Sequence, residues 1–364
     1  MLTKQKIAIL NSRQGLYPCR LHAWIQKTLE TLTSLKSSQP VILSSIGMST
    51  WDLVTIAASR LQLPLELHIQ IKNKQTKEEL AKQIISGYKL NPQFVSFHFI
   101  TENSDKVFQT KRDNTITASA DIIFPISIRK KGNLERLIST HQQKVNNLFQ
   151  IDYKNRTDKI AYTLNHCNLS TEIQNISNKY IIHWTKTSKN KWYYERQYDY
   201  YKDILRSDIY PRSAFDSLTN IINLKKIYAT PTHMPQNIPT VSFTSLTPME
   251  IVPLFRWRSR YQEMSFEPYG IGIKKEIAAK RNIQKVLYYD KNRSDDISII
   301  NEKVWLTQSK GERTNWESEN EYRHLGDFHF EDIDKQNIIL FTRYKKEADQ
   351  LQKLTGIQTV SFNS

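Results

Sequence analysis

The sequence predicts an α/β protein with two domains, a parallel-sheet domain followed by an α+β domain. The first observation is size, because 364 residues with 39% hydrophobic side chains are enough for two cores. The second is pattern, since residues 1–148 alternate short apolar runs with helical periodicities, whereas residues 181–364 contain mainly short strands. Residues 149–180 are polar and lack Gly and Pro, so we interpret them as a linker with some helix.

Apolar runs and amphipathic segments alternate along the first domain. Strands are expected at Ile7–Leu10, Val41–Ser44, Leu65–Ile71, Phe94–Ile100 and Asp121–Ile128, with helices at Leu21–Leu35, Thr50–Leu61 and Lys77–Ile85. This alternation is typical of a parallel sheet that is covered by helices on both faces.

Three loops of this domain follow strands and contain residue types that bind anions. Ligands of such sheets bind beyond the carboxyl ends of the strands, where a Gly/Ser loop at a helix N-terminus offers free N–H groups. The candidate nucleotide-binding residues are Ser12, Arg13, Gly47, Ser49, Thr50 and Arg129. The alternative is a set of caps and turns without a ligand, because the sequence lacks a full Gly-x-Gly-x-x-Gly motif.

Three segments in the later part of this domain carry a family resemblance. They are Lys111-Arg112-Asp113, Ala120–Ile126 and Gly132-Asn133-Leu134. Together they resemble the later half of nucleotide-binding Rossmann-like proteins of the DprA and LOG (SLOG) type. The resemblance implies a Rossmann-like fold with a nucleotide ligand.

The second domain contains short strands and few helices. Strands are expected at Ile181–Thr185, Val241–Thr244, Tyr269–Ile273, Lys285–Tyr289 and Ile338–Thr342, with helices at Ala214–Leu224 and Lys274–Ala279. Ser213 precedes the first of these helices and is a suitable N-cap.

Polar residues recur on three of the strand-like segments in a fixed order. His183 and Thr185 share one face of the first segment, Ser242 and Thr244 lie on a later one, and a cluster from Glu317 to Arg323 ends the series. This order resembles ADP-ribosyltransferases, including the DNA-modifying toxins, and implies an ADP-ribosyltransferase-like fold that uses NAD.

The resemblance implies a role for each of these residues. Glu319 and Glu321, which we expect on one face of an extended segment, would hold the ribose and the acceptor, and His183 completes the catalytic set. Residues expected to contact NAD are Thr185, Ser242, Thr244, Tyr269 and Arg323. The alternatives are an exposed strand edge with a salt bridge for the glutamates and Arg323, and ordinary packing for the other side chains.

A second resemblance covers the same half of the chain. The segments Val241–Thr244, Phe266–Ile273, Val286–Tyr289 and Glu319–Arg323 look like abortive-infection proteins of the AbiGi type, which are associated with resistance to phage. It implies a role in antiviral defence.

The chain is strongly basic, with 52 Lys and Arg residues against 36 Asp and Glu residues and a net charge of +16. This excess favours polyanionic partners such as nucleic acid. Arg256, Arg258 and Arg260 are the candidate nucleic-acid contacts, and the Tyr-rich run from Trp192 to Tyr201 is interpreted as a helix that packs its aromatic face on the core. Two alternatives to an NAD-dependent ADP-ribosyltransferase remain. One is a non-enzymatic nucleotide or nucleic-acid sensing module, and the other is a metal-dependent nuclease that uses Glu317, Glu319 and Glu321.

Other classes of protein are not indicated. Cys19 and Cys167 are too far apart for a zinc site, and the adjacent His166 and Cys167 are interpreted as a surface pair, so no metal is expected. No apolar run approaches the length of a membrane span and no signal peptide is present, so a cytoplasmic protein is expected. The sequence does not define an oligomeric state.

Overall fold

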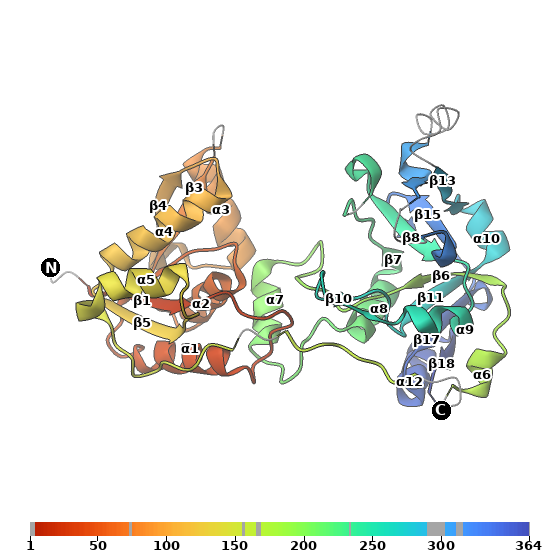
Figure 1. The fold of residues 1–364 in the computed structure, drawn as a ribbon, viewed down its shortest axis with the longest axis horizontal. Helices are drawn as coiled ribbons and strands as arrows, with labels where there is room; N and C mark the ends of the chain where they lie inside the picture. The colour runs from red at the N-terminus through yellow and green to blue at the C-terminus, as the bar shows by residue number, and fades with distance from the viewer. Residues whose placement is uncertain are drawn as a thin grey trace. The chain divides into compact units, whose positions relative to one another are not determined.

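The computed structural model describes residues 4–72, 75–154, 157–164, 169–232, 234–289, 303–310 and 316–363. Its internal contacts divide the chain into two compact units (Figure 1). Unit 1 comprises Met1–Asp158 and Lys189–Pro211, and unit 2 comprises Lys159–Ser188 and Arg212–Ser364. The sequence-based boundaries had assigned residues 189–211 to the second domain, whereas these residues pack within unit 1.

Unit 1 contains the parallel sheet that the sequence predicts. Its strands are β1 (Lys6–Asn11), β2 (Val41–Ser44), β3 (Leu65–Ile71), β4 (Val95–Thr101) and β5 (Ile122–Ser127). All neighbours in the order β4-β3-β2-β1-β5 pair in parallel, which confirms a Rossmann-like arrangement. The order reverses at β1, because β2 lies on one side of β1 and β5 lies on the other.

The helices of unit 1 cover both faces of the sheet. They are α1 (Ala23–Ser34), α2 (Ser49–Arg60), α3 (Lys77–Tyr88), α4 (Asp105–Ser119), α5 (Asn133–Thr140) and α7 (Gln197–Ile204). Right-handed crossovers put α1, α2 and α3 on one face and α4 on the other, because the crossover from β4 to β5 runs back across the sheet. The two buried clusters agree, since one contains Leu32 of α1 and Ile84 of α3, and the other contains Ile116 of α4.

Helix α7 belongs to the core of unit 1, although it follows the first strand of unit 2 in sequence. Tyr200, Tyr201 and Ile204 are buried in the same cluster as side chains of α1, α2 and α3. The prediction that the Tyr-rich run packs its aromatic face on a core is therefore confirmed for Tyr200 and Tyr201, and the core is that of unit 1; Tyr193 and Tyr194 precede the helix and are exposed.

The expected linker is partly built into the two units. Phe149 is buried in unit 1, where Val145 and Ile151 form isolated bridges with β5. At the other end, helix α6 (Thr171–Gln174) buries Ile173 in unit 2. His166 and Cys167 lie outside the described residues.

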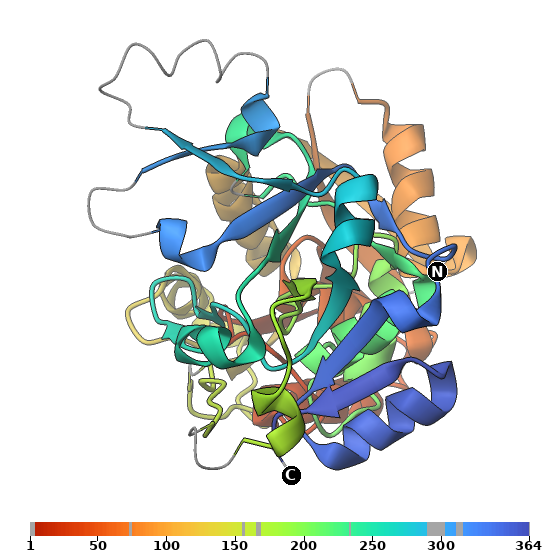
Figure 2. The same ribbon diagram turned by 90° about the vertical axis from the view of Figure 1, so that its right-hand side faces the viewer.

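Unit 2 is built on a seven-stranded mixed sheet in the order β12-β15-β8-β6-β11-β17-β18 (Figure 2). These strands are β6 (Tyr180–Trp184), β8 (Thr240–Thr244), β11 (Gly270–Lys274), β12 (Gln284–Lys285), β15 (Glu321–Leu325), β17 (Ile338–Thr342) and β18 (Gln358–Ser361). Three short pairs accompany the sheet: β7 (Lys226–Ile227) with β16 (Phe328–His329), β9 (Trp257–Arg258) with β10 (Glu263–Met264), and β13 (Leu287–Tyr289) with β14 (Thr307–Ser309). The expected strand Lys285–Tyr289 is thus divided between β12 and β13, which belong to different sheets.

Besides α6, the described part of unit 2 contains the α-helices α8 (Ala214–Leu224), α9 (Pro248–Ile251), α10 (Lys275–Lys280) and α12 (Lys345–Thr355). Ser213 caps α8 as predicted, because its hydroxyl accepts from the Asp216 N–H while Asp216 accepts from the Ser213 N–H. Helix α12 ends at Gly356, whose φ of 68° is a conformation that favours glycine.

Candidate active site

The carboxylate of Glu321 is the centre of a polar cluster on unit 2. Ser242 on β8 donates its hydroxyl to Glu321 Oε1 at 2.9 Å. Arg323, two residues further along β15, donates from Nε to Oε1 at 2.8 Å and from Nη2 to Oε2 at 3.0 Å. Both carboxylate oxygens are therefore held by donors from two neighbouring strands, and we refer to Ser242, Glu319, Glu321, Arg323 and Arg258 as the carboxylate cluster.

Arg323 is fixed on its far side as well. Its side chain is 2% exposed and its Nη1 donates to the carbonyl oxygens of Trp305 and Thr307 at 3.1 and 3.2 Å. Its Nη2 also donates to Gln308 Oε1 at 3.0 Å. A buried guanidinium with five acceptors around it cannot reorient freely, so it fixes the position of the Glu321 carboxylate.

Glu319 has different surroundings from Glu321. Its carboxylate lies 3.6 Å from Arg258 Nη2, and Thr244 donates its hydroxyl to the Glu319 carbonyl oxygen at 2.6 Å. Burial raises the pKa of Glu319; the guanidinium of Arg258 opposes this rise, and the charge of Glu321 adds to it. The electrostatic effect of Glu321 indicates that the two carboxylates lie close together.

The expectation that Glu319 and Glu321 share one extended segment is wrong. Glu319 ends a short 3-10 helix (Trp316–Glu319), and Asn320 has a φ of 42° before β15 begins at Glu321. The turn, rather than strand alternation, brings the two carboxylates together.

Tyr288 on β13 is a neighbour of the cluster that the sequence did not indicate. Burial, followed by the charges of Glu321 and Glu319, raises the pKa of its phenol. Tyr288 pairs in register with Gln308 of β14, which contacts Arg323. Its signal in the sequence, the first of two adjacent Tyr residues after Val286 and Leu287, is not distinguishable from ordinary packing.

Pairing registers decide which predicted residues share a face of the sheet. Directly opposite residues lie on the same face, so the pairs Glu321↔Thr244 and Arg323↔Ser242 put these four side chains together. The pair Ile182↔Thr244 then puts His183 on the other face, where its ring contacts Phe243 with centroids 5.8 Å apart.

His183 nevertheless connects β6 to the cluster strand. Its Nδ1 donates to the Ser242 carbonyl oxygen at 2.8 Å, at the place where β6 and β8 share a single paired position. Burial lowers the pKa of His183, which favours the neutral ring with the proton on Nδ1. The structure therefore gives His183 a direct contact with the backbone of β8.

Thr185 and Tyr269 are engaged in packing and internal hydrogen bonds. The Thr185 hydroxyl lies 2.9 Å from the Ala214 carbonyl oxygen and 3.1 Å from that of Tyr269, so its proton can serve either acceptor. Tyr269 packs on Phe215 and donates its hydroxyl to Glu347 at 3.1 Å. Both side chains are buried, at 3% and 6% exposure.

The predicted arginine run lies on and around the β9–β10 hairpin. Arg258 donates from Nε to Ser265 at 2.7 Å and also approaches Glu319. Arg256 and Arg260 are exposed, and the Arg260 guanidinium lies 5.7 Å from the centre of the Tyr261 ring. The hairpin therefore combines a cationic, aromatic tip with a contact to the carboxylate cluster.

The nucleotide-binding candidates of unit 1 separate into two places. Ser12, Arg13 and Arg129 lie together where β1 and β5 end, since the Arg129 N–H donates to the Ser12 hydroxyl at 2.9 Å. Gly47 precedes α2, Ser49 is the first residue of that helix, and Thr50 is buried at 3% exposure.

The Gly47 loop is engaged by a carboxylate of unit 1 itself. The Gly47 N–H donates to Asp52 Oδ1 at 2.8 Å, and Tyr88 donates its hydroxyl to the same oxygen at 2.6 Å. Gln197 and Tyr201, both on α7, donate to Asp52 Oδ2 at 3.1 and 3.4 Å. Burial raises the pKa of Asp52 to about 6, although these hydrogen bonds oppose the rise.

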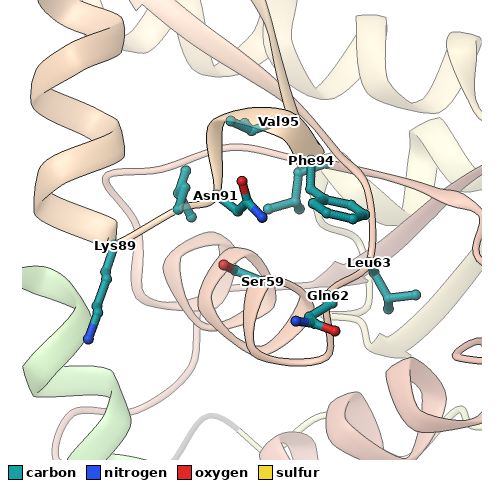
Figure 3. A pocket seen from close by; sticks show the side chains of 9 residues that line it. Ser59, Gln62, Leu63, Lys89, Asn91, Phe94 and Val95 are labelled. Carbon is teal, nitrogen blue, oxygen red and sulfur yellow. The ribbon is translucent and has the colours of Figure 1, made fainter.

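A small hollow of about 130 Å³ lies in unit 1 at the end of the sheet where β3 and β4 begin, away from the loops that follow the strands (Figure 3). Leu65 and Val95, which begin β3 and β4, line it together with Gln62, Lys89 and Phe94. None of the predicted ligand-binding residues lines this hollow.

Two kinds of feature are absent from the described ranges of the chain. There, no group of three or more His, Cys, Asp or Glu side chains is arranged to hold a metal ion. No helix among these residues combines the length and the apolar character that crossing a membrane requires.

Comparisons with known proteins give little that bears on the function. No family model matches the chain, and no curated protein matches it. A structure of DNA processing protein A from Helicobacter pylori, determined to study its single-stranded DNA binding mode, matches with 18% sequence identity and a TM-score of 0.30. The match covers 41% of this chain and 69% of that chain, and at this level it carries no functional argument. The resemblances to ADP-ribosyltransferases and to AbiGi-type proteins have no counterpart in these comparisons.

Proposed function

We propose that unit 2 uses NAD, either to transfer ADP-ribose to an acceptor or to cleave the nicotinamide bond. The observation that carries the proposal is the hydrogen-bonded carboxylate of Glu321, with Ser242 and Arg323 as its donors. Ser242 and Glu321 are 79 positions apart in the sequence, and both were expected at the site from the motif order alone.

The chemistry of NAD cleavage requires a negative group at a fixed position. Departure of nicotinamide leaves positive charge on the ribose, and a preorganised carboxylate stabilises that charge without reorganisation at the moment of reaction. Glu321 meets this requirement because Arg323 and Ser242 hold both of its oxygens.

Glu319 is suited to a different task. Its raised pKa, caused mainly by burial, brings the carboxyl group closer to the range in which a base accepts protons from a nucleophile. Glu319 would accept the proton of the attacking hydroxyl or amine of an acceptor, while Glu321 remains in place beside the ribose.

Cationic groups near Glu319 fit the diphosphate of NAD. Arg258, Arg256 and Lys186 all lower the pKa of Glu319, so they lie within electrostatic reach of its carboxylate. Guanidinium groups bind phosphate oxygens with two parallel hydrogen bonds. The residues present therefore suit two parts of NAD, with cations at the diphosphate and a carboxylate at the ribose whose bond to nicotinamide breaks.

Release of nicotinamide by the purified chain tests the proposal. Glu321→Gln keeps the size of the side chain and removes its charge, so turnover is expected to fall by about a hundredfold or more. Glu317→Gln is the matched control, because Glu317 is 49% exposed and pairs with Lys310 outside the cluster. Equal turnover in the wild type and in Glu321→Gln, with and without added DNA or RNA, would refute the proposed chemistry.

The resemblance to abortive-infection proteins extends the proposal to phage defence. Plaque formation on cells that express the wild type, Glu321→Gln or Glu317→Gln tests it. Protection by Glu317→Gln and none by Glu321→Gln is the expected pattern.

A second candidate is nucleic-acid binding without catalysis, and the β9–β10 hairpin is the observation that favours it. Tyr261 is 42% exposed beside Arg260, and this pairing can stack a base and contact a phosphate. Binding of this kind weakens steeply with salt, falls in a Tyr261→Ala variant, and is unchanged by Glu321→Gln.

A further inference from the structure

Two arginines meet where β1 and β5 end in unit 1. Arg13 lies two residues beyond β1 and Arg129 two residues beyond β5. The last residues of these strands, Asn11 and Ser127, are paired in register. This is the point at which the strand order reverses, and loops at such a point in a parallel sheet form a ligand-binding crevice.

The backbones of both loops are held in place by hydrogen bonds. The Ser12 N–H donates to the Ser127 carbonyl oxygen at 2.9 Å, and the Arg129 N–H donates to the Ser12 hydroxyl at the same distance. Tyr153 donates its hydroxyl to the Arg13 carbonyl oxygen at 2.7 Å. The two arginines therefore project from a fixed framework.

Both guanidinium groups keep a full positive charge that can attract an anion. Within the part of the chain that the structure describes, Arg13 and Arg129 form no ion pair with a carboxylate, although Arg20 and Arg112 each do. Both side chains are exposed. Both also act on the phenol of Tyr153, since each guanidinium opposes the rise in its pKa that burial causes, which puts both charges near one hydroxyl group.

A buried acceptor without a donor lies at the same end of β1. Asn11 is 6% exposed, and its Nδ2 donates to the Thr28 hydroxyl at 3.1 Å. Among the described residues, Asn11 Oδ1 has no partner. A buried carbonyl oxygen without a donor is costly, so a donor group supplied by a ligand would remove this cost.

We propose that unit 1 binds a small phosphorylated ligand at this place, with phosphate oxygens on Arg13 and Arg129 and a hydroxyl or amine of the ligand on Asn11. The site is independent of the NAD chemistry proposed for unit 2. It excludes the Gly47 loop, because the Asp52 carboxylate already takes the Gly47 N–H and would repel a second anion.

The probe is inorganic pyrophosphate, titrated into the full-length chain by calorimetry at constant ionic strength. The test variant is Arg13→Ala/Arg129→Ala, and binding is expected to weaken at least about tenfold for each arginine removed. Arg60→Ala is the control, because it removes one exposed positive charge from the C-terminal end of α2. The C-terminal end of α2 lies where β3 begins, at the opposite end of the strands from Arg13 and Arg129. Arg60→Ala should therefore bind pyrophosphate as the wild type does.

Two results would overturn the proposal: equal binding of pyrophosphate by the wild type and the double variant, or no saturable binding at all. A single-stranded oligonucleotide separates the sources of phosphate. Displacement of the oligonucleotide by pyrophosphate supports the site, whereas oligonucleotide binding that depends on both arginines and that pyrophosphate does not displace overturns the small-ligand form.

Discussion

Ile204→Ala is expected to destabilise unit 1, although Ile204 follows the first strand of unit 2 in the sequence. Ile204 is 0% exposed on α7 and belongs to the same buried cluster as side chains of α1, α2 and α3. The change removes three carbon atoms, which costs about 2.4 kcal/mol at about 0.8 kcal/mol for each buried methylene. A residual cavity brings the expected loss to about 3–4 kcal/mol.

Native-state hydrogen exchange measures this loss unit by unit. Amides of β1, β2 and β3 that exchange only when unit 1 unfolds should exchange at least about a hundredfold faster, since each 1.4 kcal/mol, roughly, is a factor of ten. Amides of β11 and β17 serve as the internal reference in unit 2. Ile209→Ala is the control, because Ile209 lies in the same segment and is 75% exposed, so its truncation should cost less than about 0.5 kcal/mol.

The loss is expected in unit 1 because of the assignment of residues 189–211 to that unit. Unchanged exchange in β1, β2 and β3 of Ile204→Ala would refute it, and so would faster exchange confined to β11 and β17. The same assignment predicts that a fragment ending at residue 158 lacks part of its core, because Tyr200 and Tyr201 would be missing with Ile204.

Three further predictions concern charged groups. The pKa of Asp52 in the folded state, about 6, lies above its ordinary value of 3.8, so the folded state binds the proton more tightly than the unfolded state does. The free energy of unfolding should therefore fall by on the order of 3 kcal/mol as pH rises from about 4 to about 6. Urea titrations of Asp52→Asn should no longer show this pH dependence. Arg258→Ala removes a positive charge that lowers the pKa of Glu319, so this pKa should rise. In a plot of kcat for nicotinamide release against pH, the acidic limb should move to higher pH. Arg323→Met leaves the Glu321 carboxylate without its cation, so thermal unfolding should show a free energy of unfolding that is lower by about 3–5 kcal/mol. Arg281→Ala is the control: it breaks an exposed ion pair with Asp332 and should lower the free energy of unfolding by less than about 1 kcal/mol.

The strands of unit 1 could be predicted because each buried strand is a short run of mostly apolar residues in the sequence. The expected ranges Val41–Ser44 and Leu65–Ile71 coincide with β2 and β3. Helix α4 was not predicted, since only four of its residues are buried and two of these are Arg112 and Thr117. Helix α12 escaped for the same reason, with only Ala348 and Leu351 buried. A helix that covers little of the core has too few apolar positions to produce a clear 3.6-residue period.

The partners of each element were harder to infer than the elements themselves. The aromatic face of α7 was visible in the sequence, but no local pattern says which core receives it. The faces of β8 were also visible, because Ser242 and Thr244 alternate with Phe243. The neighbour relation of β15 to β8 was not, and it is this pairing that brings Glu321 to Ser242. The positive φ of Asn320 was equally hidden, and it decides where Glu319 lies.

The different surroundings of the two glutamates lead to a last prediction. Glu321 is fixed by Arg323 and Ser242, while Glu319 is half-buried, has a raised pKa and lies 3.6 Å from Arg258. Two carboxylates with such different surroundings in one site take different roles in catalysis. If Glu321 stabilises the ribose and Glu319 deprotonates the acceptor, Glu319→Gln should keep slow release of nicotinamide to water but lose transfer to an acceptor. Glu321→Gln should lose both, because the bond to nicotinamide must break in either reaction. Equal loss of both reactions in Glu319→Gln would mean that the two carboxylates act as one unit at the ribose.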